Sequence, residues 1–450
     1  MGTAAATAAA SPHSINAKSP PEAVAALALD LVPSWSSSAS APPLPLSALA
    51  IKVISGGITN ALWSVTVSDE ITEISPRAIA VRAYGDKTDL LIDRGLEVET
   101  LKLLNSAGFG AKVLASFESG RVEEFLPGRA LTPEETAEKG TAERIARGLA
   151  RLHAVDLRKH RGRKNPFSLL FSSCFSSSGS RECDESSLFP TIRDWIALAD
   201  KLGAEAEEKA GAAKKPSPSV SSTELRAEVA LLEEEIKASC SRSSSSSGFC
   251  PELSRVVFCH MDLLPGNIMT TGELGAEKEK ASGGGGSSDL NEKPEKGSSK
   301  TISGPGSNLQ FIDFEYGRRC HAGFDVGNHW CEYAGLDCDW SRYPSEEQQR
   351  RFARAYLSEA DSISISKSSS STSTSSPSTS SPPSPPSEER VSAFVQLARL
   401  FSLAAHLFWT AWGKVQVHVS PIDFDYGAYA RSRFDDFRER KKEKKGGVGV

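Results

Sequence analysis

The residues best suited to chemistry gather in the stretch VVFCHMDLLPGN, which runs from Val256 to Asn267. An apolar strand there leads into a polar loop that carries His260, Asp262 and Asn267 in the spacing HxDxxxxN. Transfer of a phosphoryl group to an alcohol needs an acceptor for the hydroxyl proton and a metal ligand beside it. A loop with aspartate and asparagine five residues apart can supply both, whereas the spacing alone is only moderately rare in a chain of this length.

A second acidic motif, LQFIDFEYG at 309–317, places Asp313 at the end of another apolar strand. Kinase-type phosphoryl transfer uses a Mg²⁺-binding aspartate in this position. Two carboxylates and an amide can hold one or two Mg²⁺ ions, which neutralise part of the charge of a triphosphate. The two motifs together predict a phosphotransferase site, with Asp262 as the catalytic base and Asn267 and Asp313 as the metal ligands.

A glycine-tipped hairpin, SGGITN at 55–60, precedes these acids in the chain. Gly56 and Gly57 would let backbone N–H groups approach phosphates, since a Cβ blocks such an approach, although two glycines alone also suit an ordinary β-turn. Arg82 on the next strand can contact a phosphate, and Glu97 in the following helix can hold that arginine in an ion pair. Their order ahead of a hinge favours phosphate binding over a solvated surface role.

The elements that must position these residues fall into two groups. Alternating or β-branched runs predict strands at 51–54, 61–67, 78–84, 113–117 and 121–125, with one helix at 96–107. Helical spacing then dominates, with a start at Thr132 and helices at 141–153, 192–202 and 223–238. This pattern predicts an α+β, two-lobed fold, with a small β-rich lobe over 23–128 and a larger, mostly helical lobe over 129–440.

Low-complexity segments interrupt this plan. The composition predicts a disordered N-terminal tail over 1–22, a basic, glycine-rich tail over 441–450 and surface insertions near 172–187, 240–248, 272–308 and 362–388. One insertion lies between Asn267 and Asp313, whose strands must be neighbours. Because the entropy of closing a loop grows only with the logarithm of its length, this insertion is compatible with an intact site.

Bulk composition narrows the class of partner. A net charge of -5 offers no electrostatic footprint for nucleic acid. The eight cysteines form no CxxC pair or zinc spacing, which is typical of reduced thiols. The sequence contains no uninterrupted apolar run of about 18 residues, the length that a membrane span needs. The first residues also lack the pattern of a secretory signal. We therefore expect a cytoplasmic enzyme with a small-molecule substrate and no stable membrane insertion, and the sequence leaves the oligomeric state open.

The chain resembles the choline/ethanolamine kinase family, and most closely its ethanolamine kinase branch. The similarity is carried by SGGITN at 55–60, VRAYGDKTDLLIDR at 81–94, CHMDLLPGNIM at 259–269, FIDFEYGRRCHAGFDVGNHWCEYAG at 311–335 and HLFWTAWGKVQVHVSPIDFDYGAYARSRF at 406–434. The resemblance implies a protein-kinase-like fold, ATP and Mg²⁺ as cofactors, and formation of phosphoethanolamine, the first step of the CDP-ethanolamine route to phosphatidylethanolamine.

The resemblance also assigns roles. The catalytic residues are then Asp262, His260, Asn267 and Asp313. The nucleotide-binding residues are Gly56, Gly57, Thr59 and Asn60 of the hairpin, Arg82 with its partner Glu97, and the backbone of Glu124 and Leu126 at the hinge. The pocket for the substrate cation is formed by Glu332, Trp409, Trp412, Phe424 and Tyr429, although the two tryptophans, three apart on an apolar helix, also suit a plain core role.

One departure from the family bears on the choice of amine. At Asp337, choline kinases have an aromatic residue, which suits a quaternary ammonium. A primary ammonium has N–H bonds to donate, so an acidic acceptor there favours ethanolamine. Two alternatives stay open: a choline or dual-specificity kinase, and a catalytically inactive kinase fold that acts as a scaffold. A protein kinase is disfavoured because GxGxxG and APE segments are missing and Asp313 is followed by Phe-Glu.

Overall fold

The computed structural model describes residues 15–36, 44–54, 60–71, 74–85, 87–156, 186–210, 220–241, 248–271, 308–369 and 384–445. These residues form two compact units, one made of residues 1–106 and 110–127 and the other of 107–109 and 128–450. The tip of the predicted glycine hairpin at 55–59, the predicted insertion near 172–187 up to residue 185, and most of the insertion near 272–308 lie outside the described residues.

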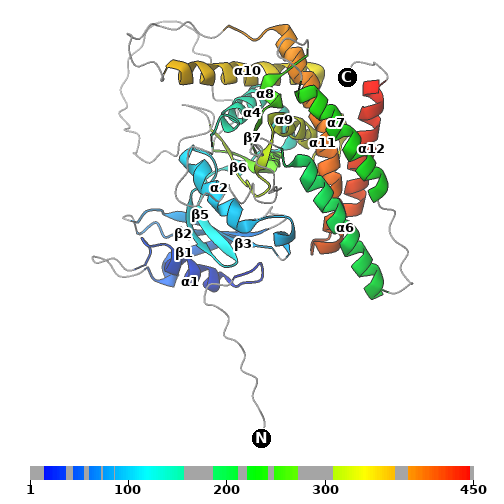
Figure 1. Cartoon of the computed structure of the whole chain (residues 1–450). Helices are drawn as coiled ribbons and strands as arrows, with labels where there is room; N and C mark the ends of the chain where they lie inside the picture. Colours follow the sequence, from blue (N-terminus) through cyan, green and yellow to red (C-terminus); the bar gives the residue numbers. More distant parts are fainter. Residues whose placement is uncertain are drawn as a thin grey trace, which may run out of the picture. The chain divides into compact units, whose positions relative to one another are not determined.

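The first unit is built on a five-stranded antiparallel sheet (blue to cyan in Figure 1), in the order β1-β2-β3-β5-β4. The strands are β1 Leu49–Val53, β2 Asn60–Val67, β3 Ala78–Tyr84, β4 Val113–Phe117 and β5 Gly120–Glu124, and the helices are α1 Pro21–Leu31 and α2 Arg94–Ser106. The central strand β3 is buried along its length, which its run of alanine, isoleucine and valine allows. The predicted strands and the predicted helix between the third and fourth of them are therefore confirmed.

The N-terminal boundary differs from the prediction of a disordered tail over 1–22. Ile15 is only 5 % exposed, and its backbone N–H and C=O both bond to the Ser119 hydroxyl, at 3.3 and 3.0 Å. The unpredicted helix α1 begins at Pro21 and buries Val24 and Leu27 in the core of the sheet. The composition of this stretch, rich in alanine, is typical of low complexity. Alanine is also the residue that most favours helix, and here it forms a helix with an apolar face.

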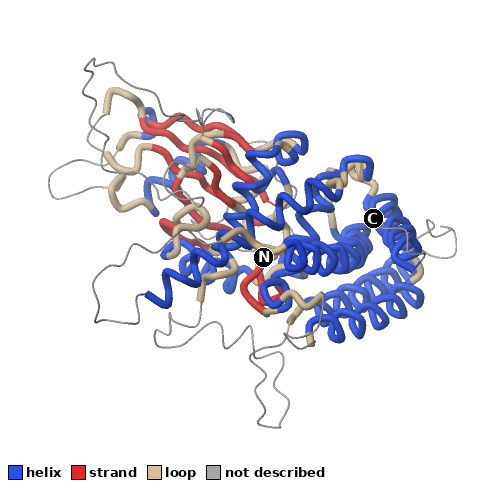
Figure 2. The backbone as a smooth tube through the Cα atoms, turned by 90° about the horizontal axis from the view of Figure 1, so that it is seen from above, coloured by secondary structure: helices blue, strands red, loops and turns tan. Residues whose placement is uncertain are grey.

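The second unit is mostly helical, as predicted, and Figure 2 shows its long helices running side by side. Its helices are α3 Pro133–Ala137, α4 Lys139–Leu152, α6 Leu188–Ala210, α7 Ser222–Cys240, α8 Pro251–Ser254, α9 Ala322–Cys331, α10 Glu346–Ser369, α11 Glu388–Val419 and α12 Tyr426–Lys445. Short antiparallel ladders join β7 Val256–Cys259 to β10 Arg318–His321, and join β6 Arg129–Ala130, β8 Ile268–Thr270 and β9 Leu309–Phe311 in that order.

The start of this unit depends on a glycine. Gly128 has φ of +117°, and a Cβ at this position would lie 2.1 Å from the carbonyl oxygen of Thr270. Only glycine tolerates both the positive φ and such a close approach of two backbones. The close contact holds the chain entering β6 against β8, the strand that follows the polar loop.

Helix α11 is the core of the second unit. It is long and apolar enough to cross a membrane by composition alone, but 83 % of its most apolar window is buried inside the described structure. Helices α6, α9 and α12 pack against it, in agreement with the adjacent green, olive and red ribbons of Figure 1. A helix covered on several sides by protein needs an apolar surface all round, which explains its composition without a membrane.

Two predicted low-complexity boundaries are wrong. Helix α10 continues to Ser369, well into the insertion predicted near 362–388. Within it, the hydroxyls of Ser362 and Ser366 donate to the carbonyl oxygens four residues earlier, at 2.9 Å. Helix α12 likewise continues into the predicted 441–450 tail, where Lys441 and Lys444 pair with acidic side chains of α7.

Candidate active site

The polar loop between β7 and β8 brings two predicted site residues together. Asn267 ends a short 3₁₀ turn, Pro265–Asn267, and its Nδ2 donates to the carbonyl oxygen of Asp262 at 2.8 Å and to the Asp262 carboxylate at 3.2 Å. The amide nitrogen is therefore used to hold Asp262. The amide oxygen of Asn267 is a ligand atom of the kind that Mg²⁺ prefers.

The second acidic motif lies beside this loop. Strand β9 pairs with β8, and the backbone N–H of Ile312 donates to the carbonyl oxygen of Asn267 at 3.0 Å, so that Asp313 follows directly after the pairing. The ring of His260 also bonds to the carbonyl oxygen of Ile312, at 2.9 Å. Asp313 has a left-handed φ of 62°, which turns the chain away from the strand at this residue. The prediction that the two motifs meet across the long insertion is confirmed.

Negative charge accumulates around Asp262. Burial raises the pKa of its carboxyl group well above the ordinary value, and the charges of Glu332, Asp313 and Glu315 raise it further. Such a group of carboxylates, with the amide oxygen of Asn267 beside it, matches the oxygen ligands that Mg²⁺ prefers. The residues present therefore fit a divalent cation, and a bound cation would favour the ionised form of Asp262.

Helix α9 holds the backbone of the polar loop, a feature that the sequence analysis missed. The carboxylate of Asp325 accepts hydrogen bonds from the backbone N–H of His260 at 2.6 Å and from that of Met261 at 2.8 Å. Nδ2 of Asn328 donates to the carbonyl oxygen of Met261 at 3.1 Å, and Nδ1 of His329 bonds to that of Leu263 at 2.9 Å. Met261 has a φ of 68°, so these bonds stabilise a strained backbone.

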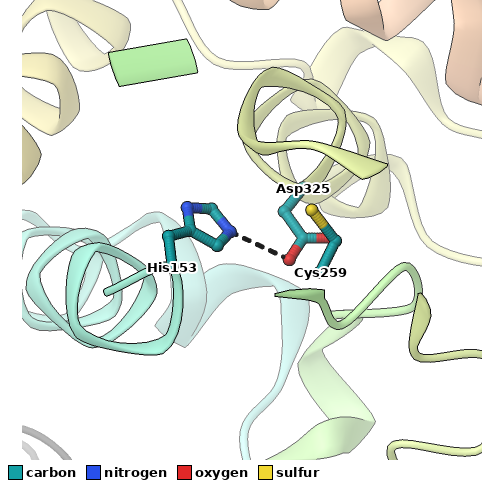
Figure 3. A group of neighbouring side chains, drawn as sticks. All are labelled: His153, Cys259 and Asp325. Carbon is teal, nitrogen blue, oxygen red and sulfur yellow. Dashed lines mark hydrogen bonds and ion pairs between the residues drawn. The ribbon is translucent and has the colours of Figure 1, made fainter. Parts of the chain in front are cut away.

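Asp325 also belongs to a buried group of side chains, shown in Figure 3, whose other members are His153 and Cys259. Their donor atoms are close enough together for a metal ion. However, Nε2 of His153 bonds to Asp325 at 3.1 Å and its Nδ1 to the hydroxyl of Tyr356 at 2.7 Å. Burial raises the pKa of the Cys259 thiol and lowers that of His153, which leaves both groups neutral. With both ring nitrogens in use and a protonated thiol, this group serves as a hydrogen-bonded support.

An aromatic cluster is assembled by α11 and the chain after it. Trp409 and Trp412 lie 5.4 Å apart between ring centroids, and Tyr429 lies 6.0 Å from Trp412 and 6.1 Å from Phe424. The four aromatic residues predicted for the cation pocket are thus brought together. Tyr316 joins them, with its hydroxyl accepting from Nε1 of Trp412 at 2.8 Å, and the sequence analysis missed it. Because Tyr316 lies three residues after Asp313, it links this cluster to the acidic site.

The acidic residues predicted for the same pocket have different surroundings. Glu332 is 4 % exposed and accepts a hydrogen bond from Arg433 at 2.8 Å, while its charge acts on Asp262. The side chain of Asp337 is 60 % exposed and pairs with Arg342 at 3.2 Å. The structure thus places Glu332 with the site, whereas Asp337 lies at the surface with a cation of its own. A role for Asp337 in the choice of amine stays a prediction.

A charged network in the first unit contains the predicted Arg82 and Glu97. Glu97 accepts hydrogen bonds from Arg121 at 2.6 Å and from Arg94 at 2.8 Å. Nε of Arg82 lies 3.7 Å from the carboxylate of Glu123. Arg82 on β3 and Arg121 on β5 are direct cross-strand neighbours, and the predicted pairing of Arg82 with Glu97 stays a prediction.

The remaining predicted nucleotide-binding residues also belong to the first unit. Asn60 begins β2, and its side-chain oxygen accepts a hydrogen bond from Arg94 at 3.1 Å. Glu124 ends β5, where its backbone N–H donates to the carbonyl oxygen of Lys112 at 2.8 Å, and Leu126 follows in a half-buried position. The predicted Gly56, Gly57 and Thr59 lie outside the described residues.

Comparisons of the sequence and of the structure with known proteins find choline and ethanolamine kinases. The family model described as Choline/ethanolamine kinase matches residues 51–438. A probable ethanolamine kinase of Arabidopsis thaliana is 32 % identical over 399 residues, which cover 88 % of this chain and 80 % of that protein. Two solved structures share the fold: an ethanolamine kinase of Plasmodium vivax (22 % identity, 88 % and 84 % coverage of this chain and that one, TM-score 0.60) and a choline kinase of Cryptosporidium parvum (21 % identity, 94 % and 96 % coverage, TM-score 0.63).

Proposed function

The chain belongs to the choline/ethanolamine kinase family, and we propose that it transfers the terminal phosphoryl group of ATP to the hydroxyl of ethanolamine, which gives phosphoethanolamine. The observation that carries this proposal is the arrangement of the second unit. A half-buried aspartate held by Asn267 lies beside a group of carboxylates, and a buried glutamate with an aromatic cluster adjoins it.

The polar loop and the acidic motif divide the chemistry between them. Asp262 accepts the hydroxyl proton of ethanolamine as the oxygen attacks phosphorus, and the hydrogen bond from Asn267 fixes the direction of its carboxylate. Asn267 and Asp313 hold Mg²⁺, which neutralises the charge of the phosphates when it is bound. His260 bonds to the Ile312 carbonyl oxygen and so ties the loop that carries Asp262 to the strand that carries Asp313.

The ammonium end of the substrate is bound by Glu332 and the aromatic cluster. Aromatic faces attract any cation, while a carboxylate also accepts N–H hydrogen bonds. A primary ammonium uses both kinds of contact, and a quaternary one uses only the first. The presence of a buried acid among the rings therefore supports ethanolamine as the preferred substrate.

The first unit binds the nucleotide. Its guanidinium groups, with Arg82 and Arg121 as cross-strand neighbours, suit the phosphates of ATP. The ordered backbone at Glu124 and Leu126 recognises the adenine. The product feeds the CDP-ethanolamine route to phosphatidylethanolamine, and the protein acts in the cytoplasm on a small-molecule substrate.

The test is turnover of Mg·ATP by the purified full chain, with ethanolamine and choline measured side by side. We expect a kcat/KM for ethanolamine at least about tenfold above that for choline, because a site that bonds to N–H groups discriminates against a cation without them. Asp262→Asn should abolish turnover, whereas the exposed Asp435→Asn on α12 should not change it. Omission of Mg²⁺ should stop the reaction.

Each arm can contradict the proposal. Equal kcat/KM for the two amines would move the assignment to a dual-specificity kinase. Turnover that persists without divalent metal would remove the metal roles of Asn267 and Asp313. No turnover with either amine, in spite of Mg·ATP binding, would favour a kinase fold that serves as a scaffold.

A further inference from the structure

Arg433 of α12 connects two residues of the cation pocket. Its Nη2 donates to Oε1 of Glu332 at 2.8 Å, and its Nε donates to the hydroxyl of Tyr429 at 3.0 Å. Tyr429 lies one helical turn earlier on α12, whereas Glu332 follows α9 in a different part of the chain. One guanidinium group therefore fixes an acid and a phenol that come from separate elements.

The surroundings keep Arg433 in place. Its side chain is fully buried, and the guanidinium carbon lies 5.2 Å from the ring centroids of both Trp340 and Tyr429. Burial alone lowers the pKa of such a group, but Tyr429 and Glu332 raise the pKa of Arg433 well above its ordinary value, so it stays charged. A planar cation held between rings has little freedom, and its rigid fork suits simultaneous bonding to two partners.

Glu332 is left with one oxygen for a ligand. Oε1 is engaged by Arg433, and within the described part of the chain the carboxylate of Glu332 has no other hydrogen-bond partner than Arg433. The Arg433–Glu332 pair is also close to neutral as a whole. The acid in the pocket thus offers a fixed hydrogen-bond acceptor more than a free negative charge.

We propose that Arg433 is a positioning residue that sets the amine specificity of the pocket, by aiming the free oxygen of Glu332 at an N–H group and reducing the net charge that attracts any cation. This inference rests on the function proposed above. Attraction between charges and cation–π contacts act on primary and quaternary ammonium ions alike. A hydrogen bond to a fixed oxygen acts only on the primary one, so Arg433 weakens the shared part of recognition and preserves the selective part.

The expected consequence is a change in selectivity rather than in chemistry. In Arg433→Met, Glu332 is freed to rotate and carries its full charge. We expect the ratio of kcat/KM for ethanolamine to that for choline to fall about tenfold, the usual value of one well-placed hydrogen bond to a charged group. The change should appear in KM for ethanolamine, with kcat within about threefold, because Arg433 contacts neither Asp262 nor Asn267 in the described structure.

Two gentler variants protect the test against misfolding. Arg433→Lys keeps the charge but replaces the fork with a single point donor, so it should lower the ratio less than methionine does. Tyr429→Phe keeps the ring and removes only the acceptor for Nε, and we expect a change in the same direction. The matched control is Arg440→Met on the same helix, where Arg440 pairs with Asp436 and stacks 3.8 Å from the centroid of Tyr343. This variant should lose stability and keep the ratio.

A double-mutant cycle distinguishes positioning from general support. If Arg433 acts through Glu332, adding Arg433→Met to Glu332→Gln should change the ratio less than about twofold. Isothermal titration of ethanolamine and choline into the same proteins should reproduce the KM effects.

An unchanged ratio in Arg433→Met and Arg433→Lys would overturn the inference, as would the same tenfold fall in the Glu332→Gln background. A wild-type protein that does not phosphorylate ethanolamine would instead overturn the proposed function first. The two failures are therefore distinguishable.

Discussion

Replacing Asp325 with asparagine tests how α9 holds the catalytic loop. The two side chains have nearly the same shape, but the amide has one acceptor and one donor where the carboxylate has two acceptors. In the structure, one carboxylate oxygen accepts from the N–H of His260 and the other from the N–H of Met261. In either orientation of the amide, its NH₂ group therefore faces a backbone N–H that has lost its acceptor.

The magnitude follows from these contacts. A buried N–H without an acceptor costs about 1–3 kcal/mol, and the remaining bond loses the charge that strengthened it. We expect Asp325→Asn to lower the free energy of unfolding by about 2–4 kcal/mol. Because the loop carries Asp262 and Asn267, a displacement of about 1 Å would lower kcat roughly a hundredfold.

The assay combines thermal denaturation with steady-state kinetics. We expect kcat to fall at least about tenfold while KM for ethanolamine stays within about threefold, because Glu332 and the aromatic residues lie outside the loop. The matched control is Tyr356→Phe, which removes the partner of the His153 ring and leaves Asp325 in place. It should lose about 1–2 kcal/mol of stability and keep kcat. A full kcat in Asp325→Asn, whatever its stability, would refute the positioning role of α9.

Two further predictions concern buried charges. Glu97→Gln should lower the free energy of unfolding by about 3 kcal/mol, since it removes one of the two carboxylates that pair with the fully buried Arg121. Chemical denaturation measures this change. The control is Glu99→Gln, in a half-exposed pair with Lys102, which should change the free energy of unfolding by less than about 1 kcal/mol. Equal losses of stability in the two variants would contradict the reasoning. Burial lowers the pKa of His406 to about 4 despite the nearby Asp436, so the unfolded chain, with a pKa near 6.5, binds the proton first. The free energy of unfolding should therefore fall as pH decreases from about 6.5 towards 4, by roughly 3 kcal/mol from this group. Denaturation midpoints of the protein and of His406→Phe across this pH range measure the effect. If the midpoint of the variant fell with acid as much as that of the unchanged protein, the reasoning would be wrong.

Local structure was largely predictable from the sequence. The strand at 78–84 is found over the residues predicted, because its mostly apolar residues, with Ile79, Val81 and Tyr84 among them, suit a central strand. The start at Thr132 is confirmed by a capping box, in which Thr132 and Glu135 bond to each other's backbone N–H groups. The meeting of the two acidic motifs was also predictable, since their order and flanking strands leave few arrangements.

Partners across the fold were not predictable in the same way. The pairing of Glu97 with Arg121 depends on which arginine of two adjacent strands lies nearer to α2, and register is invisible in a single sequence. The contacts of Arg433 and Asp325 also could not be predicted from the spacing of residues in the sequence. Arg433 lies 101 positions from Glu332, and Asp325 lies 65 positions from His260. Their roles follow from long-range packing rather than from a local pattern.

The spacing of residues on α9 explains how the two halves of the second unit's site are kept in register. Asp325, Asn328, His329 and Glu332 are separated by three, one and three residues, which places them on one face of a helical segment. The first three bond to the backbone of the polar loop, and Glu332 is the acid of the cation pocket. Asn328 contacts both sides, because its Nδ2 donates to Met261 while its Oδ1 accepts from Nε1 of Trp409 at 2.7 Å. Helix α9 and the turn that follows it thus connect the loop that carries the proton acceptor to the acid of the ammonium site.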